Sequence, residues 1–274
     1  MLLKFILHIP FESREEIVTM NLVFLLFLQL TGLLAIAMAY HKVSGAIAAQ
    51  RKEAIALADN MFNQIESLNS IYVELGFHHA LPPTRGWAAS PDFLRNIMTT
   101  ALTQKPLTIV ECSSGVSTIV LARCMEILGA GHVYSLEHDE AFAEQTRTLL
   151  RKYGLERFAT VCNAPLKEIS LPGWSGKWYS LEGLPESIEL DFLVIDGPPQ
   201  SVAEMARYPA VPCLRKIFSD QVTILLDDAD RKDEGIAVRR WLDESPDLSL
   251  ISVPRCEKGC VALKREARIP VRAL

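Results

Sequence analysis

Four acidic residues could take part in chemistry because each comes at the end of a short apolar stretch. They are Glu111 after 107–110, Glu137 after 132–136, Asp196 after 190–195 and Asp228 just beyond 222–226. Apolar and β-branched stretches of this length predict buried strands. In an open parallel sheet the carboxyl ends of the strands line one crevice, where ligands bind. We therefore expect these carboxylates to face one site, as hydrogen-bond acceptors or as a general base.

The loop after the first acid has the composition of a nucleotide-binding turn. Ser113, Ser114 and Gly115 are small, and the apolar spacing of 116–128 predicts a helix directly after them. The backbone amides at such a helix start favour a carboxylate or phosphate. Of the dinucleotide fingerprint G-x-G-x-x-G only Gly115 is present, which disfavours NAD. S-adenosylmethionine carries no phosphate, and Glu111 and the serine hydroxyls could bind it. The alternative is an ordinary strand-to-helix turn.

Two further positions fit a nucleoside ligand. Glu137 lies about 20 residues beyond the loop, where an acid binds ribose hydroxyls in nucleotide-binding folds; a solvated strand end is the alternative interpretation. Asn163 and Ala164 follow a strand expected at 159–162 and lie where an adenine amine could be bound. These residues support a nucleoside without choosing between a dinucleotide and S-adenosylmethionine.

The expected elements alternate between strand and helix from residue 90 onward, which predicts an α/β fold with a doubly wound, mostly parallel sheet of about seven strands. A helix begins after Ser90, with Ser90 as N-cap and Pro91 in its first turn. Further helices are expected at 116–128 and 139–153, strands at 107–111, 132–137, 159–162, 190–195 and 222–226, and a closing hairpin at 248–253 and 261–264.

The N-terminal part of the chain has a different character. Residues 22–40 are almost entirely apolar and long enough to cross a bilayer as a helix. A cleaved signal peptide is the alternative. Lys42, Arg51 and Lys52 follow this stretch, so the positive-inside rule places the rest of the chain in the cytoplasm. Translation could start at Met1 or at Met20, which directly precedes the apolar stretch.

A helical stalk is expected to follow. Apolar residues recur at alternating spacings of three and four over 44–75, which is typical of a coiled-coil seam, although Arg51 interrupts it. The pattern fits a dimerising coiled coil and a stalk packed on its own domain equally well. The predicted organisation is a tail at 1–21, a transmembrane helix at 22–40, a stalk at 41–76 and a catalytic domain at 77–274.

Composition narrows the choice of partners. The formal net charge of the 274 residues is -5, which disfavours nucleic acid as a substrate. The six cysteines lie mostly in apolar stretches and are expected to be free thiols. Cys256 and Cys260 lack a second Cys or His pair nearby, so a zinc site is not expected.

From about Leu81 to the closing hairpin, the chain resembles the class I S-adenosylmethionine-dependent methyltransferases, and among them the bacterial branch called methyltransferase domain 24. The motifs that carry this resemblance are GWAASPDFL (86–94), IVECSSGVST (109–118), YSLEHD (134–139), NAPL (163–166), VIDGPP (194–199), ARYPAVP (206–212) and LLDDADR (225–231). The resemblance implies a Rossmann-like sheet and S-adenosylmethionine as cofactor, and says little about the acceptor.

The resemblance also assigns roles to individual residues. It implies that Glu111 and the loop of Ser113, Ser114, Gly115 and Ser117 hold the methionine part of the cofactor. Glu137 would hold the ribose with His138 beside it, Asn163 and Ala164 the adenine, and Asp196 would lie near the sulfonium and the acceptor. The family usually has glycine where Ser113 and Ser117 stand, so this departure concerns cofactor affinity.

Catalysis then requires alignment of the reacting atoms and, for a hydroxyl acceptor, a base. Asp196 and Asp228 are the candidate bases, and Arg207, Tyr208 and Arg231 are the candidate acceptor contacts. The alternative for Arg207 and Tyr208 is packing between helix and sheet with a surface cation.

Metal-dependent O-methyltransferases, which the chain also resembles, carry an acid after the fourth strand and Asp-Asn after the fifth. Asp196 and Asp228 match that pattern, but Ala229 stands at the Asn position and only Asp230 could compensate. A divalent metal is therefore not favoured, and no metal ligand is assigned.

The leading hypothesis is a single-pass methyltransferase of the bacterial inner membrane, with its catalytic domain in the cytoplasm. Its acceptor would be a small molecule, a lipid-linked compound or a glycan. One alternative is a membrane-tethered scaffold on a methyltransferase fold. A nicotinamide-dependent oxidoreductase is a weaker alternative because the glycine-rich loop is missing.

Overall fold

The computed structural model describes residues 14–84 and 86–265. The chain divides into two compact units, Met1–Asp59 and Asn60–Leu274. One helix, α2 (Arg14–Leu75), begins in the first unit and ends in the second. Of the expected tail at 1–21, residues 1–13 lie outside the described part, and residues 14–21 are helical.

The described part of the first unit is helix throughout. Its apolar side chains are exposed, for example Leu22 (59%), Phe27 (61%) and Leu34 (61%). Among the described residues, α2 is the one helix long and apolar enough to cross a membrane, judged by length and composition. A signal sequence near an N-terminus passes the same test. The predicted transmembrane helix therefore stays a prediction.

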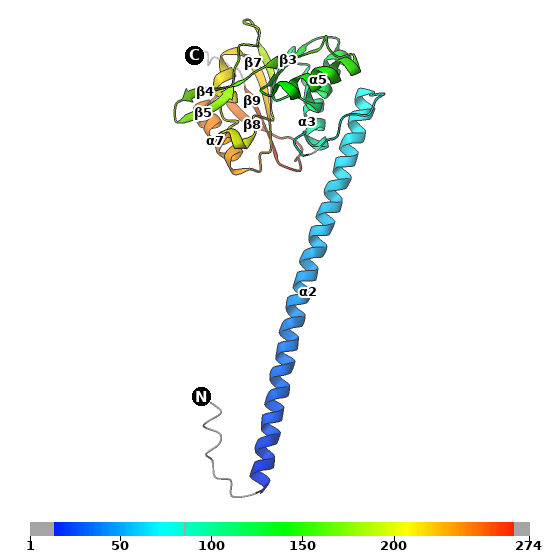
Figure 1. The fold of residues 1–274 in the computed structure, drawn as a ribbon, viewed down its shortest axis with the longest axis vertical. Helices are drawn as coiled ribbons and strands as arrows, with labels where there is room; N and C mark the ends of the chain where they lie inside the picture. Colours follow the sequence, from blue (N-terminus) through cyan, green and yellow to red (C-terminus); the bar gives the residue numbers. More distant parts are fainter. Residues whose placement is uncertain (1–13, 85, 266–274) are drawn as a thin grey trace, which may run out of the picture. The chain divides into compact units, whose positions relative to one another are not determined.

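The second unit contains a seven-stranded sheet with the order β3-β2-β1-β6-β7-β9-β8. Its strands are β1 (Thr108–Cys112), β2 (His132–Glu137), β3 (Ala159–Asn163), β6 (Leu190–Ile195), β7 (Phe218–Asp227), β8 (Leu248–Ile251) and β9 (Cys260–Arg265). The first five are parallel to one another, whereas β9 runs antiparallel to both β7 and β8. The predicted doubly wound, mostly parallel sheet with a closing hairpin is confirmed (Figure 1).

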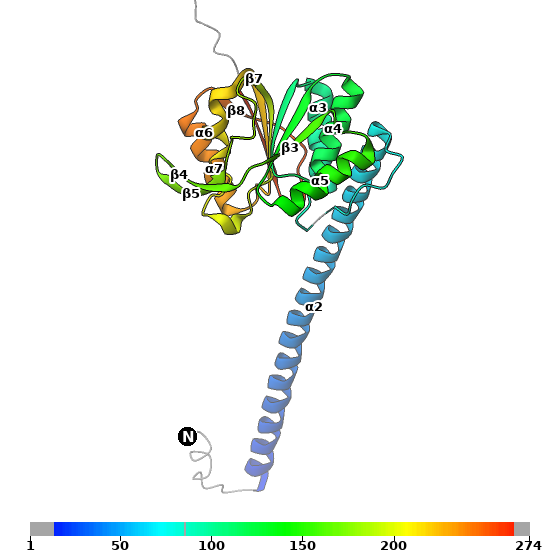
Figure 2. The same ribbon diagram turned by 45° about the horizontal axis from the view of Figure 1, so that its top comes forward.

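Helices cover both faces of this sheet. One face carries α3 (Pro91–Gln104), α4 (Val116–Leu128) and α5 (Glu140–Tyr153), and the other carries the short α6 (Ala210–Leu214) and α7 (Lys232–Glu244) (Figure 2). Short 3-10 turns at Gln200–Val202 and Arg215–Ile217 complete the second face. Each face has its own hydrophobic core.

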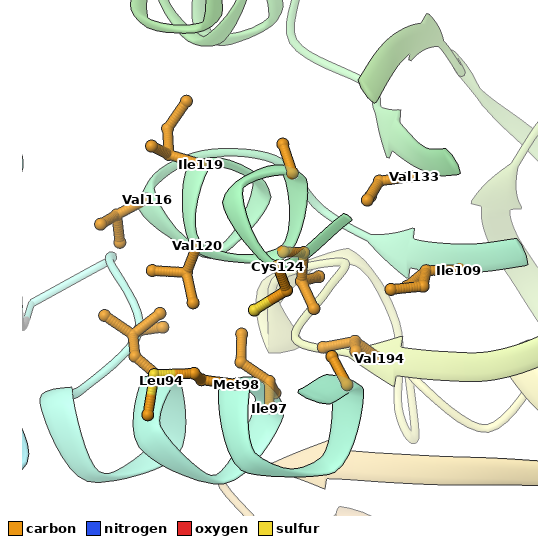
Figure 3. Packing of buried hydrophobic residues seen from close by; sticks show 14 of the residues in the cluster. Leu94, Ile97, Met98, Ile109, Val116, Ile119, Val120, Cys124, Val133 and Val194 are labelled. Carbon is orange, nitrogen blue, oxygen red and sulfur yellow. The ribbon is translucent and has the colours of Figure 1, made fainter. Parts of the chain in front are cut away.

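The alternation of side chains along the strands explains the two cores. In β1, Ile109 packs with the core of α3 and α4, while the next residue, Val110, packs with the core of α6 and α7. Figure 3 shows the first core, in which Leu94 and Met98 of α3 face Val120 of α4. By the same alternation, Glu111 must point toward α4.

A second, two-stranded sheet was not predicted. It consists of β4 (Leu166–Leu171) and β5 (Trp174–Tyr179), paired antiparallel between β3 and β6 in the chain. Trp174 and Trp178 are buried in the core shared with α7. The dipeptide Pro172-Gly173 between the two runs is a turn signal that indicates such a hairpin.

The last turns of α2 belong to the second unit. Ile71 and Leu75 are 0% and 1% exposed in the core beside α3. Gln64 Nε2 donates a hydrogen bond of 2.7 Å to Asp92 Oδ2. The compact unit therefore begins at Asn60, before the boundary expected at residue 77. The part of the predicted stalk from Asn60 onward packs on its own domain, and dimerisation stays a prediction.

The start of α3 differs from expectation in one detail. Ser90 occupies the N-cap position before Pro91, as predicted, but its side chain makes no capping bond to the backbone. The Ser90 hydroxyl donates instead to Asp92 Oδ1 at 2.6 Å. Asp92 also accepts from the amide of Phe93 at 2.9 Å and takes over the capping role, because a carboxylate is the stronger acceptor near a helix start.

Candidate active site

The first predicted acid, Glu111, lies beneath the loop rather than at its surface. Its side chain is 0% exposed, and Oε2 accepts hydrogen bonds of 2.7 Å from the hydroxyls of Thr118 and Ser135. Burial raises the pKa of Glu111, against the opposing effect of the hydroxyl hydrogen bonds. Thr118 Oγ1 in turn accepts from the Gly115 amide at 3.1 Å. Glu111 thus supports the loop through Thr118, and its side chain is closed to solvent.

The loop itself has an unusual backbone. Ser113 has φ of 125° and Gly115 has φ of 148°. Positive φ is costly for serine and cheap for glycine. Ser113, Ser114 and Gly115 are partly exposed, and a Cβ added to Gly115 would meet no heavy atom within 4 Å. The loop therefore leaves room for a ligand at its backbone, whereas Ser117 is buried in the first turn of α4.

A hydrogen bond connects this loop with the end of the neighbouring strand. Ser114 Oγ donates to Glu137 Oε2 at 2.9 Å, and Glu137 Oε1 accepts from the Asp139 amide at 3.0 Å. His138 Nδ1 lies 3.1 Å from Glu137 Oε1. The structure thus brings together Ser114, Glu137 and His138, which were expected to share the cofactor.

The adenine-side candidates lie at the end of β3. Ala164 is buried, and its amide donates to the carbonyl of Glu137 at 2.7 Å. Asn163 is exposed, and its Oδ1 accepts from Arg147 Nη2 at 2.5 Å. Both residues adjoin Glu137, since Asn163 pairs with it across β2 and β3.

At the ends of β6 and β7 the remaining acids gather around Arg207. Arg207 is 5% exposed, and its Nη2 lies 2.7 Å from Asp228 Oδ2 and 3.3 Å from Asp196 Oδ1. Arg231 Nη1 lies 2.9 Å from the same oxygen of Asp228. Asp228 has φ of 55°, which turns the chain sharply after β7. Asp196 and Asp228 therefore come together as predicted, with a guanidinium between them.

Burial shifts the protonation of this cluster. It raises the pKa of Asp196 to about 6 and that of Asp227 to about 8, and neighbouring carboxylates add to the shift. The side chain of Asp196 is 12% exposed, whereas that of Asp228 is 5% exposed. Both carboxylate oxygens of Asp227 have no hydrogen-bond partner among the described residues.

Two of the three candidate acceptor contacts are engaged elsewhere. Tyr208 is 1% exposed, its hydroxyl donates to Glu244 Oε2 at 2.6 Å, and the Arg240 guanidinium lies 3.9 Å above its ring. Tyr208 therefore packs against α7, and we do not retain it as an acceptor contact. Arg207 is likewise engaged, by ion pairs with Asp196 and Asp228. Arg231, 40% exposed, is the one of the three that solvent reaches freely.

Tyr179 lies at this edge of the sheet but was not among the predicted residues. It ends β5, is 3% exposed, and its ring lies edge-on to His138 with ring centroids 5.9 Å apart. A Cβ on Gly197 would lie 2.5 Å from its hydroxyl oxygen. Burial raises the pKa of Tyr179 well above its ordinary value, so it stays neutral. The hairpin that carries it was missed, and with it this residue.

The family comparison decides the class of the domain. Residues 110–229, which include the loop and the acids just described, match the family model described as a methyltransferase domain. These residues form a methyltransferase domain. The resemblance inferred from the sequence motifs is thereby confirmed. No curated protein sequence matches the chain.

Solved structures resemble the methyltransferase domain in fold. The methyltransferase PaMTH1 of Podospora anserina, bound to S-adenosylhomocysteine, is 18% identical, with 73% of this chain and 88% of that chain covered at a TM-score of 0.50. The N-terminal domain of human METTL16, also with S-adenosylhomocysteine, is 13% identical, with 74% and 80% covered at 0.51. An O-methyltransferase of Bacillus cereus is 17% identical, with 76% and 97% covered at 0.47.

Proposed function

We propose that this protein is a membrane-anchored, S-adenosylmethionine-dependent methyltransferase that methylates a hydroxyl oxygen of a small-molecule, lipid-linked or glycan acceptor. The observation that carries the proposal is the Ser114–Glu137 hydrogen bond, which joins a partly exposed loop after β1 to an acid at the end of β2. A small-residue loop and an acid in this register suit a nucleoside with an amino-acid head. PaMTH1 and the METTL16 domain bind S-adenosylhomocysteine, the product of the same cofactor.

The residues present fit this cofactor at three points. The backbone of Ser113, Ser114 and Gly115 would hold the methionine part, with Glu111 and Ser117 supporting the loop from below. Glu137 would hold the ribose with His138, and Asn163 and Ala164 would border the adenine. The bound cofactor supplies an activated methyl group on sulfur. The protein then has to position the acceptor and remove its proton.

Asp196 is the stronger candidate for the base. Its pKa of about 6 lies near neutral pH, where a base is both ionised and able to accept a proton. Asp228 Oδ2 is already engaged by both Arg207 and Arg231, at 2.7 and 2.9 Å. We assign the proton acceptor to Asp196 and the positioning of the arginines to Asp228. Arg231 is the contact that an acceptor could reach.

Residues 22–40 would anchor the enzyme in the bacterial inner membrane, with the methyltransferase domain in the cytoplasm. Exposed apolar side chains along this helix and the basic residues after it support the assignment. The heptad-like pattern over 44–59 would allow two chains to pair. An anchored domain suits an acceptor that is itself held at the membrane.

Calorimetric titration of the full-length protein in detergent tests the cofactor. We expect micromolar binding of S-adenosylhomocysteine and none of NAD. Glu137→Ala should weaken binding at least tenfold, about 1.4 kcal/mol. Glu168→Ala, which changes an exposed glutamate on β4, should leave it unchanged. Failure of the folded protein to bind any nucleoside would overturn the proposal and favour a tethered scaffold.

Membrane fractionation tests the anchor. The full chain should sediment with membranes and resist extraction by alkaline carbonate. A chain without residues 1–40 should become extractable. Two reporter enzymes are fused to the C-terminus in turn, one that is active in the cytoplasm and one that is active only outside it. Only the fusion with the cytoplasmic reporter should show activity. Release of the full chain by carbonate would contradict anchoring.

A further inference from the structure

The acids at the ends of β6 and β7 resemble a cation site. Asp196, Asp227 and Asp228 each offer a carboxylate oxygen, and these oxygens lie within 4.8 Å of one another. That spacing would suit a divalent metal ion, and carboxylates are the ligands that Mg²⁺ and Ca²⁺ prefer. The question is whether the residues around the cluster leave room for one.

The guanidinium of Arg207 lies among the same oxygens. Its Nη2 contacts Asp228 Oδ2 at 2.7 Å, Asp196 Oδ1 at 3.3 Å and the carbonyl of Asp196 at 3.3 Å. Its Nη1 donates to the carbonyl of Asp227 at 2.9 Å, and its Nε lies 3.8 Å from Glu234 Oε1. One buried cation thus meets carboxylate and carbonyl oxygens, a set that a hard metal ion would also take.

A divalent ion does not fit this cluster while Arg207 is present. Mg²⁺ binds oxygen at about 2.0–2.1 Å and Ca²⁺ at about 2.3–2.6 Å. An ion at such distances from Asp196 and Asp228 would stand against a guanidinium that donates to the same two residues. Arginine keeps its charge even when buried, so it cannot yield by losing a proton.

We propose that Arg207 is a built-in cation that takes the place of a divalent metal ion between Asp196 and Asp228, and that removing its guanidinium opens a metal site. The domain then needs no divalent metal, because the charge of Arg207 holds the two acids together. This inference goes beyond the proposed function, and metal titration tests it without a methyl acceptor.

Carboxylate oxygens without a hydrogen-bond partner indicate which atoms would bind the metal once the Arg207 guanidinium is removed. Both carboxylate oxygens of Asp227 and Oδ1 of Asp228 have no hydrogen-bond partner among the described residues. Asp227 and Asp228 are 1% and 4% exposed. Once the guanidinium is gone, these oxygens and those of Asp196 become available as ligands.

The experiment compares the full-length wild type with Arg207→Gln. Calorimetric titration with Mn²⁺ and Mg²⁺ is combined with thermal unfolding in the presence and absence of each metal. The wild type should show no binding heat and no shift of Tm at millimolar metal. Arg207→Gln should bind Mn²⁺ at least tenfold more tightly than the wild type, with a Tm rise of about 5 °C or more at saturation.

Two control variants separate a missing cation from a lost ion pair. Arg207→Lys retains a positive charge and should gain no metal binding. Arg215→Gln removes another arginine paired with an acid, Asp247, and should gain none either. Metal binding confined to Arg207→Gln supports the proposal, because a merely structural role would not produce it.

Two results would overturn the proposal. One is Mn²⁺ or Mg²⁺ binding by the wild type that Asp196→Asn abolishes. The other is a folded Arg207→Gln variant that binds metal no better than the wild type. If Arg207→Gln does not fold alone, it is refolded with Mn²⁺: a cooperative unfolding transition restored by the metal supports the proposal, and its continued absence counts against it.

Discussion

Glycine at position 113 should stabilise the protein, whereas glycine at position 117 should destabilise it. Ser113 has φ of 125°, and a non-glycine residue held in such a region costs about 1–3 kcal/mol. Glycine removes that cost, but it also lowers the free energy of unfolding by about 0.5–1 kcal/mol because the unfolded chain becomes more flexible. We therefore expect Ser113→Gly to raise the free energy of unfolding by about 1 kcal/mol.

Ser117 lies in a different environment although the resembled family places glycine there too. It is 3% exposed in the first turn of α4, and its hydroxyl makes a hydrogen bond to Glu111. Loss of that bond costs about 0.5–1.5 kcal/mol. Glycine in a helix costs about 0.5 kcal/mol more than serine. Ser117→Gly should therefore lower the free energy of unfolding by about 1–2 kcal/mol.

Denaturant unfolding of the full chain, followed by tryptophan fluorescence, measures both variants. The two glycine variants should differ by about 2–3 kcal/mol, the sum of the opposing effects. Ser113→Ala is the matched control, because it removes the hydroxyl but keeps the Cβ and should bring no gain. Equal destabilisation by both glycines would refute the assignment of backbone strain to Ser113.

Three further predictions concern packing, domain limits and pH. Gly197→Ala should lower the free energy of unfolding by about 1–3 kcal/mol, because the new Cβ would lie 2.5 Å from the Tyr179 hydroxyl oxygen. A Cβ at Gly235 in α7 would have its nearest heavy atom at 3.9 Å, so Gly235→Ala should raise the free energy of unfolding by up to about 1 kcal/mol. If both variants change the free energy of unfolding in the same direction, the packing argument is contradicted. Ile71→Ala should cost about 2–5 kcal/mol in domain unfolding, and Ile65→Ala on the exposed side of α2 less than about 0.5 kcal/mol; similar effects would show that α2 contributes nothing specific to the domain. Burial raises the pKa of Asp227 to about 8 from 3.8, so the folded state binds an extra proton between these values and stability falls as the pH rises through this range. The free energy of unfolding of Asp227→Asn lacks this dependence on pH, so it should rise relative to that of the wild type by up to about 1.4 kcal/mol per pH unit from about pH 4 to about pH 8. If unfolding curves over this pH range show a constant difference in free energy between variant and wild type, the raised pKa is rejected.

Much of the fold could be predicted because local patterns determine it. The helix at 116–128 and the strands at 132–137 and 190–195 have the bounds that their apolar spacing indicated. Acids at the ends of parallel strands must meet at one edge of the sheet, so the sequence alone could place Glu137, Asp196 and Asp228 at that edge. The hairpin at 166–179 was missed because its alternation is weak, apart from the Pro172-Gly173 turn.

The sequence by itself determined the order of strands and helices and which edge of the sheet carries the acids, because both follow from periodicity along the chain. Only the tertiary structure decided what each side chain does there. Glu111 and Glu137 both end a strand, yet Glu111 points beneath α4 and Glu137 toward Ser114. Arg207 and Tyr208 are neighbours, yet one joins the acids and the other packs on α7. These partners lie far apart along the chain, and packing of the two faces of the sheet brings them into contact.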